Sequence, residues 1–154
     1  MVQYRLTMRG RPRLLNENQV VDAVGTYLEW RHFHVPQKLR TSQPGIDIIA
    51  QFPDRKGELW VEAKGATSSK PGSKRFKLGF SGSQRKDHVA NAVYTALSYI
   101  SRSPGTRPRR AGIAVPLDHR EKLVDPVLAT LSKLGVVVFL VSTNGDVEVI
   151  GNLE

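Results

Sequence analysis

The chain contains no cysteine, which removes several kinds of chemistry from consideration. Without thiols it has no disulfide framework, no thiolate zinc site and no cysteine nucleophile, so a reducing cytoplasm is the expected location. Long apolar runs are also missing. No stretch of about 18 uncharged apolar residues occurs, and no apolar segment follows the N-terminal arginines, so neither a membrane span nor a secretory signal is expected.

Acidic residues are scarce relative to basic ones. The 14 Asp and Glu residues against 23 Lys and Arg residues give a formal net charge of +9 and a pI near 10.2. Nucleic acid is the expected partner, because neutralising its phosphates releases counterions and gives affinity without any reading of sequence. A membrane surface would require a basic amphipathic helix, whereas the helices expected here have apolar faces suited to a core. The alternative is a basic protein whose charge identifies no partner.

Hydrophobic periodicity divides the chain into helices and strands. Helical spacing of apolar residues predicts helices over residues 16–30, 83–101 and 119–134. Runs rich in β-forming residues predict strands over residues 33–39, 46–52, 58–64, 111–115, 136–141 and 147–150. The second and third strands are expected to form a hairpin, and Pro126 is expected to kink or divide the last helix. This order predicts one α/β domain over residues 16–154, with a mixed sheet flanked by helices, after a basic arm over residues 1–15.

The strand predicted over residues 58–64 ends with two charges, Glu62 and Lys64, which share a face because they lie two residues apart. With a five-residue loop, the hairpin sets Asp47 opposite Ala63, and a single bulge would bring Asp47 opposite Glu62. Two neighbouring carboxylates repel each other unless a cation lies between them. A divalent metal with oxygen ligands would relieve this repulsion. Lys64 beside it could orient or deprotonate a water molecule, or stabilise charge on a phosphate.

The segment PGID at residues 44–47, followed by EAK at residues 62–64, resembles the motif of the PD-(D/E)xK nuclease superfamily. Here Gly45 and Ile46 separate the proline from the aspartate, which is a loosened form of the motif. The predicted order of helix, three strands, helix and strand, over about residues 16–115, also resembles the αβββαβ core of that family. The resemblance therefore implies a restriction-endonuclease-like fold, extended here by a C-terminal helix and two strands.

The resemblance also assigns roles to the residues at the strand ends. By the resemblance, Asp47 and Glu62 are metal ligands, the Ala63 carbonyl is a further ligand, and Lys64 is the catalytic lysine. The implied cofactor is Mg²⁺, with Mn²⁺ as a possible substitute.

Two polar residues near helix starts are further candidates for the catalytic site. Many members of the superfamily, including archaeal Holliday junction resolvases and Mrr-like restriction enzymes, bring a glutamate from the first helix. Glu17 lies on the inward face of that predicted helix and Asp22 on the outer face, so Glu17 is the better candidate for a catalytic metal ligand. An acid favoured by the helix dipole is the alternative. Gln84 resembles the polar residue that several branches place after the lysine, although a role near the N-cap explains it equally well.

Basic residues elsewhere are expected to hold the phosphate backbone. The candidates in the loop before the second helix and at the start of that helix are Lys70, Lys74, Arg75, Lys77, Arg85 and Lys86. The segment RGRPR at residues 9–13 adds Arg9, Arg11 and Arg13 and resembles the core of an AT-hook. Met8 stands where an AT-hook has proline, so a general phosphate-binding arm is the better interpretation; a solvated charge run and a disordered tail are the alternatives.

These features together predict a Mg²⁺-dependent DNA endonuclease that hydrolyses phosphodiester bonds. No target-recognition domain is visible, which favours structure-selective cleavage of duplex or branched DNA, as in a junction resolvase; a restriction or phage nuclease is the other option within this class. Cutting both strands would favour a homodimer. The alternatives are a noncatalytic nucleic-acid-binding protein on the same fold, a nuclease directed at RNA, and a plain ion pair between Lys64 and Asp47 or Glu62.

Overall fold

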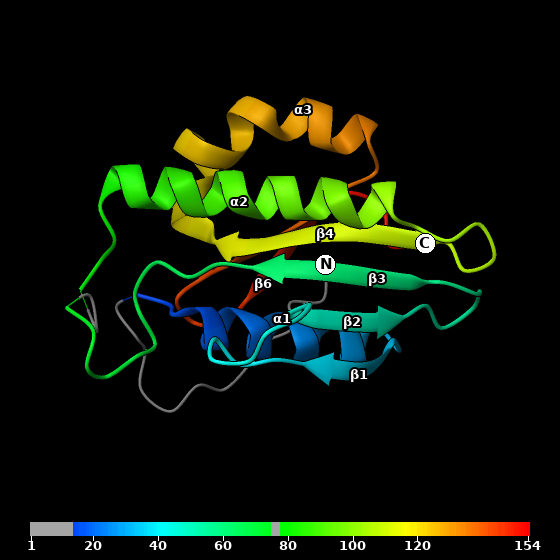
Figure 1. Ribbon diagram of the computed structural model, residues 1–154, viewed down its shortest axis with the longest axis horizontal. Coiled ribbons are helices and arrows are strands. Elements are labelled where there is room, and N and C mark those ends of the chain that lie inside the picture. Colours follow the sequence, from blue (N-terminus) through cyan, green and yellow to red (C-terminus); the bar gives the residue numbers. More distant parts are fainter. Residues whose placement is uncertain (1–13, 75–77) are drawn as a thin grey trace.

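Six strands form one mixed sheet in a computed structural model that describes residues 14–74 and 78–154 (Figure 1). The strands, in their order across the sheet, are β1 (His34–Lys38), β2 (Ile48–Gln51), β3 (Glu58–Ala63), β4 (Arg109–Pro116), β5 (Val137–Val141) and β6 (Val147–Ile150). Strands β3, β4 and β5 are parallel, and the other neighbouring pairs are antiparallel. The helices are α1 (Glu17–Trp30), α2 (Gly82–Ser101) and α3 (Asp125–Lys133). The predicted α/β class and mixed sheet are therefore confirmed.

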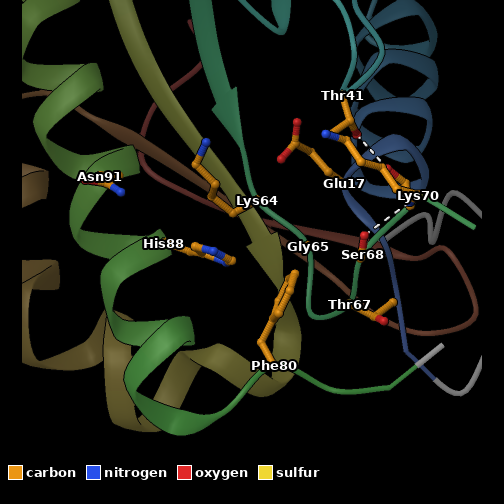
Figure 2. A pocket seen from close by; sticks show the side chains of 11 residues that line it. Glu17, Thr41, Lys64, Gly65, Thr67, Ser68, Lys70, Phe80, His88 and Asn91 are labelled. Atoms are coloured by element: carbon orange, nitrogen blue, oxygen red, sulfur yellow. Dashed lines mark hydrogen bonds between the residues drawn. The ribbon is translucent and has the colours of Figure 1, made fainter. Parts of the chain in front are cut away.

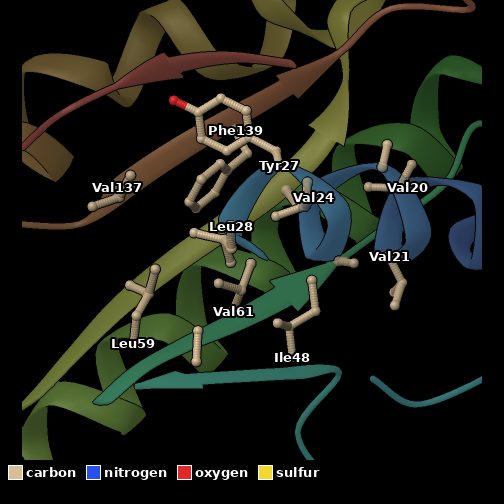
Figure 3. Packing of buried hydrophobic residues seen from close by; sticks show 14 of the residues in the cluster. Val20, Val21, Val24, Tyr27, Leu28, Ile48, Leu59, Val61, Val137 and Phe139 are labelled. Carbon is tan, nitrogen blue, oxygen red and sulfur yellow. The ribbon is translucent and has the colours of Figure 1, made fainter. Parts of the chain in front are cut away.

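The helices cover both faces of the sheet and bury an apolar core on each side (Figure 1). The core under α1 contains Val20, Val24 and Leu28 from the helix and Leu59, Val61 and Phe139 from the strands (Figure 3). The core under α2 and α3 contains Val89, Ala92, Ala96, Ile113, Val115 and Leu131. Strands β4 and β5 contribute to both cores, which explains why each reads as a continuous apolar run.

Helices α1 and α2 both begin with a capping box. The Asn16 Oδ1 atom accepts the Gln19 backbone N–H, and the Gln19 Oε1 atom accepts the Asn16 backbone N–H, each at 2.9 Å. Ser81 and Gln84 exchange the same two bonds at 3.2 and 2.9 Å. These bonds satisfy backbone donors that have no partner inside the helix and fix where each helix starts.

The predicted third helix is divided, as Pro126 suggested. The chain first makes a 3₁₀ turn (Leu117–His119) and a π-helical turn (Arg120–Val124), and α3 begins only at Asp125. Proline has no N–H to donate, so it is tolerated in the first turn of a helix but not in its interior. Pro126 lies in the first turn of α3.

The predicted basic arm of residues 1–15 lies outside the described residues except for Leu14 and Leu15. Leu15 is buried in the core under α1, and its carbonyl accepts the Ala66 N–H at 2.7 Å. The described part of the folded domain therefore extends at least one residue further toward the N-terminus than the predicted boundary at residue 16. None of the helices in the described part of the chain is long and apolar enough to cross a membrane.

Candidate active site

Asp47 and Glu62 lie at facing positions where β2 begins and β3 ends. Ile48 pairs with Val61, and continuing this register by one residue sets Asp47 opposite Glu62. The sequence-based register, which set Asp47 opposite Ala63, was wrong by one residue. Gln51 pairs with Glu58, so the connection spans the six residues 52–57 rather than five. The two carboxylates therefore come together without the predicted bulge.

Asp47 is nearly buried, with 8% of its surface exposed. Its Oδ2 atom accepts the Ala63 backbone N–H at 2.8 Å. Burial, then the negative charge of Glu62 and more weakly that of Glu17, raise the pKa of Asp47; the Ala63 bond and Lys64 offset this in part, and the resulting pKa is about 7. The Asp47 carboxyl is therefore poised between its two protonation states near neutral pH, and a nearby cation would favour the charged state.

Glu62 is held by two hydrogen-bond donors on the α2 side of the sheet. The Lys64 Nζ atom donates to Glu62 Oε1 at 2.7 Å, and the Tyr99 hydroxyl donates to Glu62 Oε2 at 3.1 Å. Burial lowers the pKa of Lys64, but the hydrogen bond to Glu62 and the neighbouring acids outweigh burial, so the pKa is raised overall. Lys64 is therefore a fixed ammonium in this arrangement. As predicted, Glu62 and Lys64 point to the same side.

A pocket of about 250 Å³ opens beside Lys64 and is lined by Glu17 from the first turn of α1. Figure 2 shows the Glu17 carboxylate turned toward the side of the pocket where Lys64 lies. Burial raises the pKa of Glu17; Lys64 lowers it and Glu62 raises it, so Glu17 belongs to the same electrostatic group. Asp22 instead pairs with Arg40 at 3.0 Å on the outer face of α1. Glu17 therefore lies beside the same pocket as Lys64 and Asp22 does not, while a role for Glu17 as a metal ligand stays a prediction.

Two residues of this site were missed by sequence reasoning. His88 of α2 lines the pocket beside Lys64, and its ring packs edge-on against Phe80 at 4.6 Å between centroids (Figure 2). Burial and the charge of Lys64 lower the pKa of His88, which favours the neutral ring. Tyr99 is the other. Its place could have been inferred from the sequence, because Tyr99 follows the small residue Ala96 by three positions and so shares the face of α2 that packs against the sheet.

The remaining candidates are placed in different surroundings. The side-chain oxygen of Gln84 accepts the Ser81 backbone N–H, so the structure shows Gln84 in a capping role. Arg85 pairs with Asp118 at 3.3 Å and also donates to the Phe80 carbonyl at 3.1 Å. Lys70, which lines the pocket, is exposed, and so are Lys74 and Lys86. Arg9, Arg11, Arg13, Arg75 and Lys77 lie outside the described residues.

The acidic residues match the donor chemistry of a hard cation only in part. Within residues 14–74 and 78–154, no group of three or more His, Asp or Glu side chains is close enough together to hold a metal ion. Glu17 therefore influences Asp47 and Glu62 electrostatically without joining them in a ready three-carboxylate cage. Mg²⁺, however, is usually bound by one or two carboxylates, with water and substrate phosphate completing its shell. Asp47 and Glu62 fit that smaller requirement.

Comparison of the chain with models of protein families, with curated proteins and with solved structures gave no match.

Proposed function

We propose that this protein is a metal-dependent DNA endonuclease with a restriction-endonuclease-like arrangement of its core. The observation that carries the proposal is the meeting of Asp47 and Glu62 at one end of the hairpin, with the pKa of Asp47 raised to about 7 and Lys64 beside them. The order of elements from α1 to β4 supports it, because it is the order expected of that core. The net charge of +9 supports nucleic acid as the substrate.

Mg²⁺, or Mn²⁺ in its place, would be held by Asp47, Glu62 and the Ala63 carbonyl. Glu17 would be attracted to the ion electrostatically. When bound, such an ion polarises a phosphate and lowers the pKa of a coordinated water. The case for a metal ion at these residues is the mutual repulsion of the acids, because Glu62 and Glu17 each raise the pKa of Asp47. A cation would remove that repulsion.

The chain's own residues have separable roles in this proposal. Lys64 carries a positive charge and would stabilise negative charge that builds on the phosphate, rather than accept a proton from water. Tyr99 orients Glu62 through its hydroxyl; burial raises the pKa of Tyr99, so the hydroxyl keeps its proton. The pocket beside Lys64 offers polar groups of Ser68, Lys70 and Asn91 to a neighbouring part of the substrate.

A second candidate function is noncatalytic binding of nucleic acid on the same fold. The observation that favours it is the 2.7 Å ion pair between Lys64 and Glu62, which neutralises both side chains without any metal. Such a protein would bind DNA with steep salt dependence and would ignore divalent cations.

Cleavage assays separate these functions. The purified protein is incubated with Mg²⁺ or Mn²⁺ and with plasmid, linear duplex, flap, nicked and four-way junction DNA; a parallel RNA substrate tests the sugar preference. We expect cleavage that is lost in Glu62→Gln and Lys64→Met and kept in Asp22→Asn, whose carboxylate lies on the outer face of α1. Intact substrates throughout, or equal cutting by Glu62→Gln, would refute hydrolysis at this site.

Calorimetry provides the second readout. A nuclease should give a heat of Mg²⁺ binding that disappears in Asp47→Asn and persists in Asp22→Asn. A binding module should give no such heat with either protein. Ultracentrifugation with and without junction DNA tests the homodimer that cutting of two strands favours.

A further inference from the structure

Two connections lie side by side at the end of the sheet opposite to the candidate active site: residues 52–57 between β2 and β3, and residues 102–108 between α2 and β4 (Figure 1). Together with the first residues of β4 they bring six basic side chains to one end of the protein. We call this group the distal basic surface. It consists of Arg55, Lys56, Arg102, Arg107, Arg109 and Arg110.

The two connections are joined to each other, which fixes their relative position. The Glu58 backbone N–H donates to the Pro108 carbonyl at 3.1 Å. Gly57 permits this approach because it has a φ of 121°, and a Cβ atom there would lie 2.5 Å from the Pro108 oxygen. The Arg109 N–H also donates to the Ser103 hydroxyl at 2.7 Å. The basic side chains therefore extend from a connected backbone.

Aromatic rings position several of the guanidinium groups. Arg55 lies 4.1 Å and Arg110 lies 6.0 Å from the centroid of the Phe52 ring. Arg109 lies 3.3 Å from the centroid of the Trp60 ring. Stacking on a ring uses the flat face of a guanidinium and leaves its N–H edge available to acceptors. The Arg109 Nη1 atom donates to the Tyr99 and Arg102 carbonyls, so this guanidinium also links β4 to the end of α2.

The positive charges of this surface outnumber the negative charges beside them in sequence, which are those of Asp54 and Glu58. Within residues 14–74 and 78–154, none of the six basic side chains forms an ion pair with a carboxylate. Glu58, one of the few nearby acids, accepts the indole N–H of Trp60 at 2.7 Å. Burial and the charge of Arg55 lower the pKa of Arg110, which shows that the two cations repel. A polyanion at this surface would relieve that repulsion.

We propose that the distal basic surface is a second binding site for the phosphate backbone of a nucleic acid, separate from the candidate active site. Guanidinium forks match phosphate oxygens in pairs, and five of the six side chains are arginines. An anionic membrane fits less well, because in the described part of the chain the exposed large hydrophobic side chains lie outside these two connections. The nature of the polyanion rests on the proposed function; the site itself does not depend on hydrolysis.

The position of the surface sets the size of substrate that could use both sites. Arg110 pairs with Leu59, and Lys64 follows five residues after Leu59 along the same chain direction. At about 3.3 Å per strand residue, this separation is about 17 Å, the length of about five base pairs of duplex DNA. A substrate that contacts both sites must therefore be longer than this, so the surface selects extended nucleic acid over a mononucleotide or a short end.

The test compares two double variants that each remove two positive charges. Lys56→Gln with Arg107→Gln alters the distal basic surface, and Arg120→Gln with Lys122→Gln alters the turn Arg120–Val124, which follows the opposite end of β4. Binding of a fluorescent duplex of about 20 base pairs is measured by anisotropy, in EDTA so that no cleavage occurs, from about 50 to about 200 mM salt. Circular dichroism checks that both variants fold as the parent does.

The expected result is a shift confined to the distal variant. The slope of log affinity against log salt should become shallower by about 0.9 for each lost phosphate contact, with affinity at about 0.1 M salt reduced at least roughly tenfold. Equal losses in both variants, or no loss in either, would overturn the proposal. If only the distal variant loses affinity and the parent never cuts DNA, hydrolysis fails while this surface stands; if the parent cuts and the distal variant binds as the parent does, the surface fails while hydrolysis stands.

Discussion

Replacing Asp47 by asparagine should make the metal-free protein more stable above neutral pH. The folded state raises the pKa of this carboxyl from 3.8 to about 7, mainly through burial and then through the charge of Glu62. Between these two pH values the folded protein binds the Asp47 proton more tightly than the unfolded chain does. The free energy of unfolding therefore falls as pH rises through this window, and the whole cost is present above about pH 7.

The magnitude follows from the shift. A rise of about three pKa units corresponds to about 4 kcal/mol at 1.36 kcal/mol per unit, which is an upper bound for the cost of ionising Asp47 in the fold. Asparagine is neutral at every pH, has nearly the same shape, and retains an oxygen for the Ala63 N–H. Asp47→Asn should therefore gain about 2 to 4 kcal/mol over the parent at about pH 8 and little at about pH 4.

Urea denaturation in EDTA at both pH values measures this difference, with Asp22→Asn as the matched control at an exposed carboxylate. Mg²⁺ added at about pH 8 should stabilise the parent and leave Asp47→Asn unchanged, because a ligand stabilises only the state that binds it. If Asp47→Asn is no more stable than the parent at about pH 8, the carboxyl is not crowded as described, and the physical case for a cation beside it is lost.

Two further changes probe the supports of the site. Tyr99→Phe removes the hydroxyl that holds Glu62 Oε2; we expect about 1 kcal/mol lower stability in denaturant and roughly tenfold slower cleavage, and unchanged cleavage would show that Tyr99 does not orient Glu62. Gly65→Ala places a Cβ atom 2.5 Å from the Glu17 backbone nitrogen and 2.9 Å from the Asn16 Cα atom; we expect a loss of about 1 to 3 kcal/mol as the start of α1 is displaced, whereas Gly72→Ala, with open space around it, serves as the control.

The order of helices and strands could be predicted because local signals agree with the final fold. Asn16 with Gln19 forms a capping box that is readable from the sequence, and the helical stripe on α1 correctly separates Glu17 from Asp22. The buried strands β4 and β5 were recognisable as short continuous apolar runs, because they contribute to cores on both faces.

The details of the candidate site depended on distances that the sequence does not specify. The hairpin register differed by one residue because Phe52 leaves β2 and joins the connection, and turn length is not set by the turn-forming residues alone. The bond from Tyr99 to Glu62 joins residues 37 positions apart, through the packing of α2 on β3. For Gln84 the sequence left two roles open, and the structure shows the capping bond to Ser81, while a role in catalysis stays a prediction.

The ion pair between Lys64 and Glu62 accounts for only part of the charge at this end of the sheet. A purely structural strand end would need no further acid, yet Asp47 is nearly buried beside the pair and its pKa is raised to about 7. Lys64 is already bonded to Glu62 at 2.7 Å, and its charge lowers the Asp47 pKa less than burial and Glu62 raise it. An asparagine would keep the bond to Ala63 without the cost of burying a charge. The buried carboxylate therefore supports the proposal that a cation binds beside it, because the stability of the fold alone does not require an acid at this position.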